Sequence, residues 1–308
     1  MLFSIVIPTY NRVELLKRTL DSVWRQRFTD YETIVVDDGS IDSTLAHLQG
    51  LGSKLRVLRQ SNRGPGAARN FGAAEARGDY VAFLDSDDIW FPWTLEVFAR
   101  AAREHRSPNI LAGRFVNFSD EAELSSVWEE PYEASRFPDF ISSSHYALSV
   151  GSGTCALRTA SLGRISFLED RLNAEDHDLI LQMGTLPGFV QIVSPVTLAW
   201  RRHLDSETGD NVRSVSGSLR LLERERSSAY PGGPERARER RRILARHIRP
   251  AALACLRVGQ WTNAWRLYRA IFNWNVQLGH WKYVLGFPFL AVTRLLTRPA
   301  RANRAGWR

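Results

Sequence analysis

The stretch GDYVAFLDSDDIW, residues 78–90, decides how this chain is expected to fold. Its apolar run, YVAFL, contains β-branched and aromatic residues, which is typical of a strand buried on both faces of a sheet. Three carboxylates follow the run directly, at Asp85, Asp87 and Asp88. Two such charges about 4 Å apart repel each other by roughly 4 kcal/mol at an effective dielectric constant near 20. Either a solvated turn or a bound divalent cation would lower that cost.

Strand and helix patterns alternate through the first two-thirds of the chain. Buried strands are predicted at 3–7, 33–36, 55–58 and 80–84, and helices at 13–23, 43–48, 64–78 and 92–105. Asn11 and Glu14 have the spacing of a capping box at the start of the first helix. Beyond residue 110 the pattern loosens, with strands expected at 110–118, 153–157 and 191–200 and a short helix at 175–183. This order favours an α/β fold with a largely parallel sheet and helices on both faces.

The composition indicates a globular protein with one large domain and a smaller appendage, because 44% of the 308 residues are hydrophobic and 24% are charged. The net charge of +8 is unevenly placed: residues 235–308 hold 16 Lys and Arg but 2 Asp and Glu, whereas 1–234 are mildly acidic. The run PGGP at 231–234 is the clearest breaker in the chain. We therefore predict a domain at 1–230 and a basic, aromatic-rich helical tail at 235–308.

Cysteine use and hydropathy bear on the location of the protein. Cys155 and Cys255 have no metal-ligand spacing and give no disulfide framework, which favours a reducing compartment. The start, MLFSIVIPTYN, has no basic leader, and Pro8 ends its apolar run too early for a signal peptide. No stretch offers about 18 uncharged apolar residues, so no membrane-spanning helix is expected. These patterns predict a cytoplasmic protein.

Four polar clusters lie at the ends of predicted strands or in later loops. They are PTYN at 8–11, DDGS at 37–40, DSDD at 85–88 and EDHD at 175–178. Turn chemistry alone often places Asp, Asn, Gly and Ser after strands, so one such cluster indicates little. In open α/β sheets, however, ligands bind beyond the carboxyl ends of the strands. Four polar clusters along one edge, three of them rich in acids, therefore favour a binding site.

With these motifs in this order, the chain resembles the family 2 glycosyltransferases. The segments that carry the resemblance are SIVIPTYNR (4–12), VVDDGSIDST (35–44), NRGPGAARNFGAAEARGDY (62–80), FLDSDD (83–88) and AEDHDL (174–179). The resemblance covers about residues 3–205 and is specific for the family but not for the substrate. It implies a GT-A fold, a Rossmann-like, mostly parallel sheet flanked by helices, here with a C-terminal helical extension. It also implies inverting transfer from a nucleotide-diphosphate sugar.

Asp85 and Asp87 are two positions apart, so on an extended chain both carboxylates can face one site. Mg²⁺ is commonly held by one or two carboxylates, with diphosphate and water in the rest of its shell, and Mn²⁺ prefers the same ligands. By the resemblance, Asp87 is the metal ligand and Asp85 lies beside the ribose and the metal. A solvated acidic turn is the alternative. Asp88 fits a helix start before Pro92 as well as a role in the site.

The resemblance implies that Pro8, Tyr10 and Asp38 contact the nucleotide base of the donor. Asp37 is expected to be a structural hydrogen-bonding group, and Tyr10 has the alternative of packing on the first helix. Arg69 lies on the small-residue helix, whose glycines let the backbone approach a ligand closely. Arg69 is predicted to bind the donor diphosphate or an acidic partner in the site, with a structural ion pair as the alternative.

Displacement at an anomeric carbon requires a base that removes the proton of the acceptor hydroxyl. A single carboxylate opposite the leaving group would invert the stereochemistry, as in inverting hydrolases. The resemblance implies that Asp176 is this base and that Glu175 orients the acceptor. Asp178 is expected on the helix surface. His203 falls where related enzymes often carry a histidine near the metal or diphosphate, and it is predicted as a second metal ligand, with no ligand role as the alternative.

The tail has its own pattern. Aromatic residues recur at helical spacing and predict a core stripe that packs the tail on the main domain: Trp261, Trp265, Tyr268 and Phe272. The uncharged run YVLGFPFLAVT, 283–293, is too short to span a bilayer but suits an interfacial segment on anionic lipid. Packing or oligomerisation is the alternative. Nucleic-acid binding is not expected, because the chain shows no recognisable binding module and its body is acidic. The basic run ERARERRR, 235–242, fits a solvated helix.

The predicted function is therefore a metal-dependent inverting glycosyltransferase of the hexosyl type. Its expected donor is a UDP-sugar, with guanosine and thymidine diphosphate sugars open, and its acceptor is a glycan or lipid-linked molecule of cell-surface polysaccharide synthesis at the inner membrane face. A non-catalytic nucleotide-sugar or glycan-binding module and a sugar-phosphate nucleotidylyltransferase are the alternatives. A nucleotidylyltransferase would need a Gly-rich basic loop near the N-terminus, and this sequence has none there. A dinucleotide oxidoreductase would need its glycine turn after the first strand, where this chain has PTYN.

Overall fold

The computed structural model describes residues 1–146, 150–202 and 211–296. Its contacts divide the chain into two compact units, Met1–Arg240 (unit 1) and Arg241–Arg308 (unit 2). Helix α8, Ala237–Arg257, contains the division. The domain boundary that the sequence predicts at 231–234 stays a prediction.

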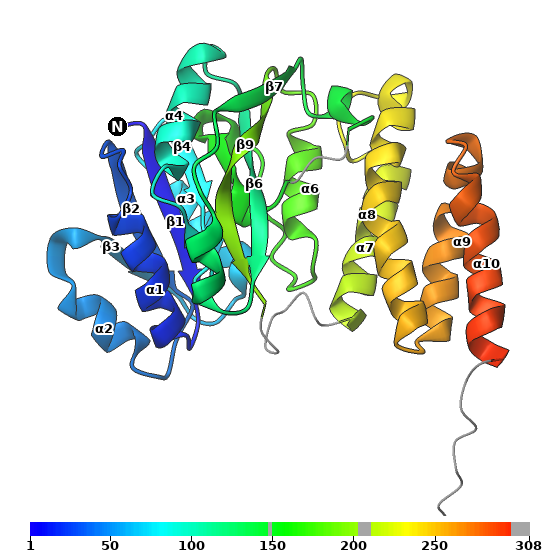
Figure 1. The fold of residues 1–308 in the computed structure, drawn as a ribbon, viewed down its shortest axis with the longest axis horizontal. Coiled ribbons are helices and arrows are strands. Elements are labelled where there is room, and N and C mark those ends of the chain that lie inside the picture. Colours follow the sequence, from blue (N-terminus) through cyan, green and yellow to red (C-terminus); the bar gives the residue numbers. More distant parts are fainter. Residues whose placement is uncertain (147–149, 203–210, 297–308) are drawn as a thin grey trace, which may run out of the picture. The chain divides into compact units, whose positions relative to one another are not determined.

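Within the described residues, unit 1 is built on one sheet of nine strands in the order β3-β2-β1-β4-β8-β6-β9-β5, with β7 paired to β9 (Figure 1). The strands are β1 Phe3–Thr9, β2 Tyr31–Asp37, β3 Arg56–Arg59, β4 Tyr80–Phe83, β5 Ile89–Trp90, β6 Ile110–Phe118, β7 Glu133–Phe137, β8 Cys155–Arg158 and β9 Phe189–Arg201. Strands β1 to β4 are parallel, whereas β8 is antiparallel to both β4 and β6. The predicted α/β architecture is confirmed, with a parallel first half and a mixed sheet as a whole.

The helices of unit 1 follow the strands in the predicted alternation as far as residue 105. They are α1 Val13–Trp24, α2 Thr44–Gly50, α3 Pro65–Ala74, α4 Thr94–Glu104, α5 Thr159–Leu162, α6 Glu175–Gln182 and α7 Asn211–Arg226. Strands β1 and β4 are buried at every position, as their apolar runs predict. Helix α7 was not expected from the sequence pattern.

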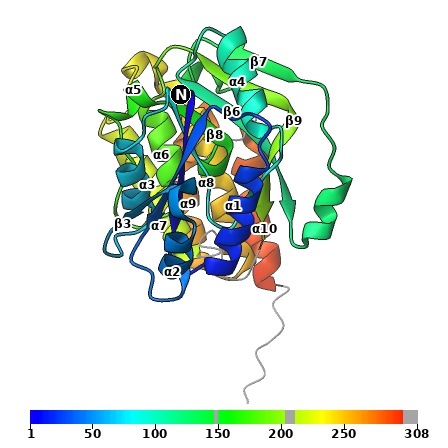
Figure 2. The same cartoon turned by 90° about the vertical axis from the view of Figure 1, so that its left-hand side faces the viewer.

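Side chains of β1 alternate between the two faces of the sheet. Phe3, Ile5 and Ile7 belong to the apolar cluster that also holds the buried residues of α1. A Cβ atom on Gly72 of α3, in contrast, would lie 2.4 Å from Cγ1 of Val6. Because residues two apart share one face of a strand, α1 and α3 cover opposite faces of the sheet (Figure 2).

Helix α3 is also held closely by the segment that contains Phe167 and Leu168. A Cβ atom on Gly66 would lie 2.2 Å from the carbonyl oxygen of Leu168. Asn70 fixes the same segment, because its side chain donates to the Phe167 carbonyl at 2.9 Å and accepts from the Phe167 N–H at 2.8 Å. Two glycines and one asparagine therefore set the position of the helix that carries Arg69.

The predicted capping box at the first helix is wrong. Helix α1 is preceded by Arg12, which makes no side-chain cap, and Glu14 instead pairs with Lys17 at 2.7 Å. Asn11 has a φ of +51°, and its Oδ1 accepts a hydrogen bond from the N–H of Ile41 at 2.8 Å. Asn11 therefore joins the turn after β1 to the turn after β2, a tertiary contact that replaces the local cap.

The basic run at 235–242 is not a wholly solvated face, contrary to the prediction. Arg240 is 3% exposed and pairs with Glu225 at 2.7 Å. Arg236 donates to both oxygens of Asp139 at 3.0 Å. Two of the basic residues in this run therefore fix the start of α8 within unit 1.

Unit 2 contains α9, Trp261–Gln277, and α10, Trp281–Leu296. The rings of Tyr268 and Phe287 stack with centroids 4.5 Å apart, and Trp265 meets Phe287 edge to face at 5.4 Å. Rings of the aromatic stripe thus pack α9 against α10, although Phe272 is 38% exposed. The expected packing of the stripe on the main domain stays a prediction. In the part of the chain that the structure describes, no helix is both long and apolar enough to cross a membrane.

Candidate active site

Asp85 and Asp87 lie in the turn between β4 and β5, at the carboxyl end of β4. Asp85 Oδ1 accepts a hydrogen bond from Arg69 at 2.7 Å, and Asp87 Oδ2 accepts one from Arg12 at 2.5 Å. The hydroxyl of Ser152 lies 3.4 Å from Asp85 Oδ2. Two guanidinium groups therefore offset the repulsion between the carboxylates. The Asp87 side chain is 13% exposed and the Asp85 side chain 31% exposed, so the turn is partly open to solvent.

The chemistry of this turn suits a hard divalent cation. Among the described residues, no three His, Cys, Asp or Glu side chains are close enough to hold a metal ion by themselves. Mg²⁺ and Mn²⁺ do not need three, because one or two carboxylates together with diphosphate and water complete the shell. Asp85 and Asp87 fit that pattern. His203, the second predicted ligand, lies outside the described residues.

Arg69 joins the end of β4 to the start of α6. It is 4% exposed and donates to Asp85 at 2.7 Å and to Glu175 at 2.9 Å. Burial alone would lower the pKa of its guanidinium, but the two carboxylates raise that pKa above its ordinary value. Its guanidinium also lies 5.3 Å from the ring centre of Phe167. Arg69 therefore stays charged and holds two acidic parts of the chain, 90 residues apart in sequence, in one place.

Asp88 supports the acidic turn from within the core. It is 2% exposed, and its Oδ1 accepts a hydrogen bond from the N–H of Arg201 at 2.9 Å. Burial raises the pKa of Asp88 well above its ordinary value, and the charges of Asp85 and Asp87 raise it further. Asp88 therefore ties the turn to the end of β9 and does not begin a helix.

Glu175 and Asp176 form the first turn of α6, directly after Ala174, whose φ is +77°. Asp176 Oδ1 accepts from the N–H of His177 at 2.7 Å and lies 2.8 Å from Nδ1 of the same residue. Burial lowers the pKa of His177, but the Asp176 carboxylate raises it to a net value above the ordinary one. Burial raises the pKa of Glu175, although the charge of Arg69 opposes that change. His177 thus fixes one oxygen of Asp176 through its backbone N–H and its ring nitrogen.

Asp178 is buried, and its predicted place on the helix surface is wrong. It is 0% exposed and accepts hydrogen bonds from Tyr230 and from Gln182, each at 2.7 Å. Arg224 of α7 forms an ion pair with it at 2.7 Å. Burial raises the pKa of Asp178, which these donors partly offset. The residue anchors α6 to α7 and to the chain around Tyr230.

Asp38 holds the start of α3. Its Oδ1 accepts from Gln60 at 2.7 Å and from the N–H of Arg63 at 2.8 Å, and its Oδ2 accepts from the N–H of Gly64 at 2.8 Å. Asp37 is fully buried and accepts from the N–H of Ser40 at 3.0 Å, in line with the structural role expected of it. The second acid of the pair thus orders the loop that leads to Arg69.

Pro8 and Tyr10 lie at the carboxyl end of β1. Pro8 is buried within the strand, opposite Val36 of β2, so the strand runs two residues further than its apolar run predicts. Tyr10 follows the strand and is 40% exposed. Together with Asp38, they stand at the edge where the first two parallel strands end.

The sequence motifs therefore meet at one edge of the sheet. Arg12 of the first motif contacts Asp87 of the fourth, and Arg69 of the third contacts acids of the fourth and fifth. Sequence reasoning missed Arg12, Asn70 and the pair formed by Arg224 and Asp178. Arg12 stands inside the quoted motif SIVIPTYNR, which was the available signal.

Comparison with known proteins identifies the family of the chain. The model of the family described as "Glycosyl transferase family 2" matches residues 4–165. The succinoglycan biosynthesis protein ExoW of Rhizobium meliloti is 44% identical over 96 residues, which are 29% of this chain and 30% of that protein. The poly(ribitol-phosphate) beta-N-acetylglucosaminyltransferase TarS of Staphylococcus aureus is 38% identical over 117 residues, 36% of this chain and 20% of that protein. The chain spans about a third or less of the length of the curated relatives it matches.

Solved structures share the fold. The structure of S. aureus TarS 1–349 in complex with UDP-GlcNAc has a TM-score of 0.69 at 20% identity and covers 98% of this chain and 93% of that one. The mannosyltransferase PcManGT from Pyrobaculum calidifontis, in complex with GDP-Man and Mn²⁺, has a TM-score of 0.54 at 19% identity, with coverages of 96% and 87%. The likeness confirms the expected GT-A fold.

Proposed function

Because the chain belongs to glycosyl transferase family 2, we propose that it transfers a sugar from a nucleotide-diphosphate sugar to an acceptor hydroxyl with inversion at the anomeric carbon. The observation that carries the proposal is the buried Arg69, which contacts Asp85 on one side and Glu175 on the other. It joins Asp85, on the turn suited to a metal-bound diphosphate, to Glu175, whose neighbour in the chain, Asp176, is the proposed general base. A protein that only binds a nucleotide would not require Glu175 and Asp176 beside the acidic turn.

On the acceptor side, Asp176 is the proposed base. Its carboxylate takes the proton of the acceptor hydroxyl as that oxygen bonds to the anomeric carbon, while the bond from that carbon to the diphosphate oxygen breaks. His177 holds Oδ1 of Asp176, and Glu175, fixed by Arg69, is placed to orient the acceptor. When bound, Mn²⁺ or Mg²⁺ supplies charge neutralisation to the leaving diphosphate. Asp87 would hold the ion, with Asp85 beside it and His203 as a proposed further ligand.

On the donor side, Pro8, Tyr10 and Asp38 are proposed to contact the base. Asp38 already accepts three hydrogen bonds. A carboxylate offers about four acceptor positions, so one N–H of a base fits beside the three protein donors. Tyr10, half exposed at the end of β1, can place its ring against the base.

The relatives narrow the choice of donor and acceptor. TarS was crystallised with UDP-GlcNAc and with UDP, which favours a UDP-sugar. GDP-Man bound to PcManGT keeps a guanosine donor as the second candidate. TarS is a poly(ribitol-phosphate) beta-N-acetylglucosaminyltransferase and ExoW is a succinoglycan biosynthesis protein, which favours a glycan or lipid-linked acceptor in polysaccharide synthesis. We further propose a cytoplasmic enzyme whose tail contacts the inner face of the membrane.

A thermal-shift screen of UDP-, GDP- and dTDP-sugars with and without Mn²⁺ tests the donor site. A ligand at a hundred times its dissociation constant stabilises the folded protein by about 2.7 kcal/mol, so the true donor should raise the melting temperature and the metal should enlarge the shift. In Asp87→Ala the metal-dependent part should disappear. A screen in which no sugar nucleotide shifts the transition, with or without metal, would contradict the proposal.

A further inference from the structure

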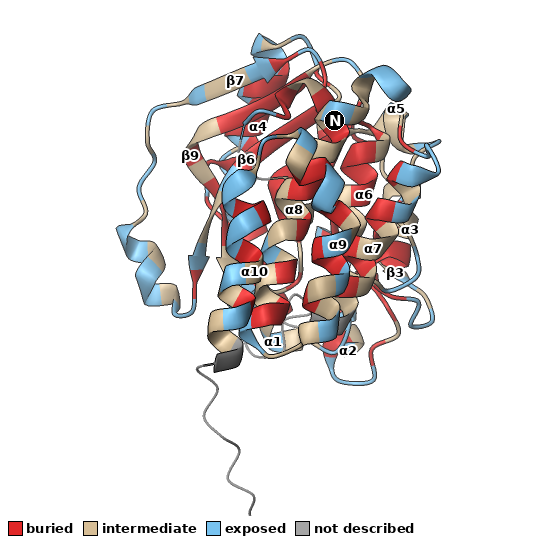
Figure 3. Cartoon of the chain, turned by 90° about the vertical axis from the view of Figure 1, so that its right-hand side faces the viewer, coloured by how far each residue is buried: buried red, intermediate tan, exposed pale blue. Residues whose placement is uncertain are grey.

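Helix α10 has two apolar faces, and one of them is exposed. One face is buried by packing within the protein and comprises Tyr283, Val284, Phe287 and Ala291. The other face, which we name the outer stripe, is exposed by 54%, 70%, 72% and 55% at Trp281, Leu285, Phe289 and Val292. The spacing of four, four and three residues places these side chains along one side of the helix. Exposed segments of α9 and α10 are visible in Figure 3.

The charge of unit 2 is of a single sign. Residues 241–296 contain nine Lys and Arg and no Asp or Glu: Arg241, Arg242, Arg246, Arg249, Arg257, Arg266, Arg269, Lys282 and Arg294. Lys282 and Arg294 stand near the two ends of α10, so the outer stripe is bordered by cations at both ends. Such a surface is complementary to an anionic partner that also offers an apolar phase.

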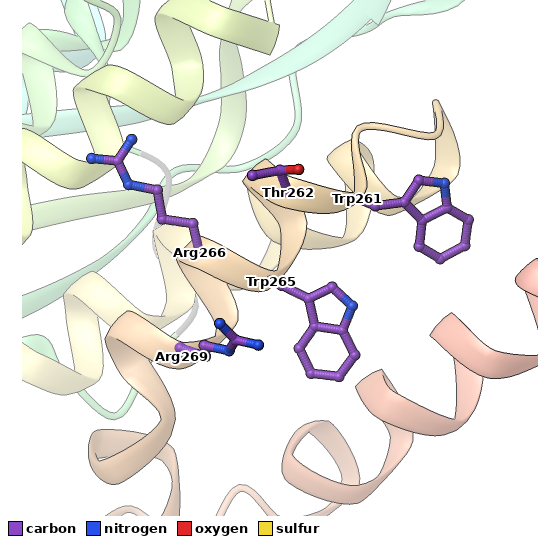
Figure 4. Close-up of a pocket in the computed structure, with 5 residues that line it drawn as sticks. All are labelled: Trp261, Thr262, Trp265, Arg266 and Arg269. Atoms are coloured by element: carbon purple, nitrogen blue, oxygen red, sulfur yellow. The ribbon is translucent and has the colours of Figure 1, made fainter.

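A groove on α9 combines the same two chemistries. It is lined by Trp261, Thr262, Trp265, Arg266 and Arg269, with a cavity volume of about 580 Å³ (Figure 4). The Arg269 guanidinium lies 5.8 Å from the ring centre of Trp265. Indole rings are enriched at the headgroup level of membranes, and guanidinium groups bind phosphate through paired donors.

We propose that α9 and α10 form a docking face for an anionic lipid bilayer. The outer stripe enters the boundary between headgroups and acyl chains, and Arg266 and Arg269 contact lipid phosphates. The proposal rests on the proposed location at a membrane and specifies which residues make the contact. Helix α10 is 16 residues long, about 24 Å, and lies along the surface without crossing it.

Two other occupants fit the same residues less well. Pairing the docking face with that of a second copy would bring together two surfaces that have no carboxylate to neutralise their cations. A nucleic acid would neutralise the arginines but leave Leu285 and Phe289, the most exposed members of the outer stripe, without an apolar partner. Both occupants are therefore outcomes of the test.

The test is flotation of the full chain with vesicles of phosphatidylcholine alone and of equal parts phosphatidylcholine and phosphatidylglycerol. The protein should float with the anionic vesicles only. Leu285→Gln combined with Phe289→Gln should weaken partitioning at least about tenfold, because the transfer of each side chain is lost. Arg266→Gln combined with Arg269→Gln should weaken it about fivefold for each cation removed and reduce its salt dependence. Trp128→Gln, 65% exposed in unit 1, is the matched control and should partition as the native chain does.

Several results would overturn the proposal. If Leu285→Gln combined with Phe289→Gln partitions to anionic vesicles as strongly as the native chain, the outer stripe does not make the contact. A native chain that self-associates in light scattering, and becomes monomeric in that variant, would assign the face to a second copy. The face would be assigned to nucleic acid if the native chain does not float with vesicles but binds an RNA or DNA duplex, and if Arg266→Gln combined with Arg269→Gln abolishes that binding. The donor screen does not depend on membrane binding. Both double glutamine variants should keep the rise in melting temperature that the sugar nucleotide causes, so a failure of the membrane proposal can be told apart from a failure of the proposed function.

Discussion

In unit 1 the carboxylates of the candidate site accept hydrogen bonds from arginines or from backbone N–H groups, whereas unit 2 contains no Asp or Glu at all. The first arrangement satisfies charge inside the protein and thereby fixes the positions of β4, α3 and α6. Unit 2 has no Asp or Glu side chain of its own, so groups outside the unit must balance the charge of its cations. Arginine thus has two settings here: Arg69 is a buried connector in unit 1, and Arg266 and Arg269 of unit 2 are exposed and are proposed to contact a partner.

The largest expected effect tests whether the acids of unit 1 perform chemistry or only hold the fold. Asp176→Asn should lower kcat between about a hundredfold and ten-thousandfold, because a general base contributes that much, while the donor thermal shift stays unchanged. Asp21→Asn, an exposed carboxylate of α1, is the control. Unchanged turnover in Asp176→Asn would remove the residue from its proposed role.

Arg69→Met tests the buried connector directly. It leaves Asp85 and Glu175 without their shared partner, and breaking a buried ion pair costs about 3–5 kcal/mol of unfolding free energy. Arg18→Met is the matched control, because its pair with Glu121 at 2.9 Å is 58% and 36% exposed and should cost about 1 kcal/mol or less. Urea unfolding measures both. Equal losses would mean that burial does not distinguish the two kinds of arginine.

The two faces of α10 provide a matched pair within unit 2. Phe287→Ala removes a ring that is 1% exposed and stacked on Tyr268, and should cost about 3–5 kcal/mol of unfolding free energy. Phe289→Ala removes a ring that is 72% exposed and should change that free energy by about 0.5 kcal/mol or less. Urea unfolding of the full chain, followed by circular dichroism, separates them. A large loss in Phe289→Ala would show that the outer stripe is structural.

The smallest effect is a pH dependence. Burial would raise the pKa of Asp139, but the hydrogen bonds from Arg236 and Ser142 lower it below its ordinary value. A carboxyl group with a lower pKa in the folded state stabilises the protein above the unfolded pKa, about 3.9, and this stabilisation is lost as the pH falls through the folded pKa. Asp139→Asn should therefore cost about 1 kcal/mol at pH 7. The difference from the native chain should shrink as the pH falls below the unfolded pKa and through the lower folded pKa, and a constant difference would exclude the ionic origin.

Sequence reasoning identified the parts of the protein that local pattern specifies. The apolar runs of β1, β2 and β4 and the aromatic stripe of α9 are in place because each depends on the periodicity of one segment. Asp178 was expected at the surface because acids usually are, and its partners Arg224 and Tyr230 lie 46 and 52 residues further along the chain. The contact between Arg12 and Asp87 likewise joins residues 75 apart. No local pattern encodes such pairs.

Asn11 shows why a local capping rule can fail in a folded protein. Its spacing to Glu14 satisfies a local rule, but a hydrogen bond to the N–H of Ile41 takes up the side chain. In an isolated peptide the local cap would have no competitor. In the folded chain, the N–H of Ile41 in the turn after β2 competes with the local cap for the Asn11 side chain.

The close fit of α3 has a consequence for redesign. A methyl group at Gly72 would meet Val6, and one at Gly66 would meet the carbonyl of Leu168, so the helix has no room to shift toward either neighbour. Any displacement would draw Arg69 away from Asp85 or Glu175. Efforts to change which sugar is accepted should therefore leave this helix intact.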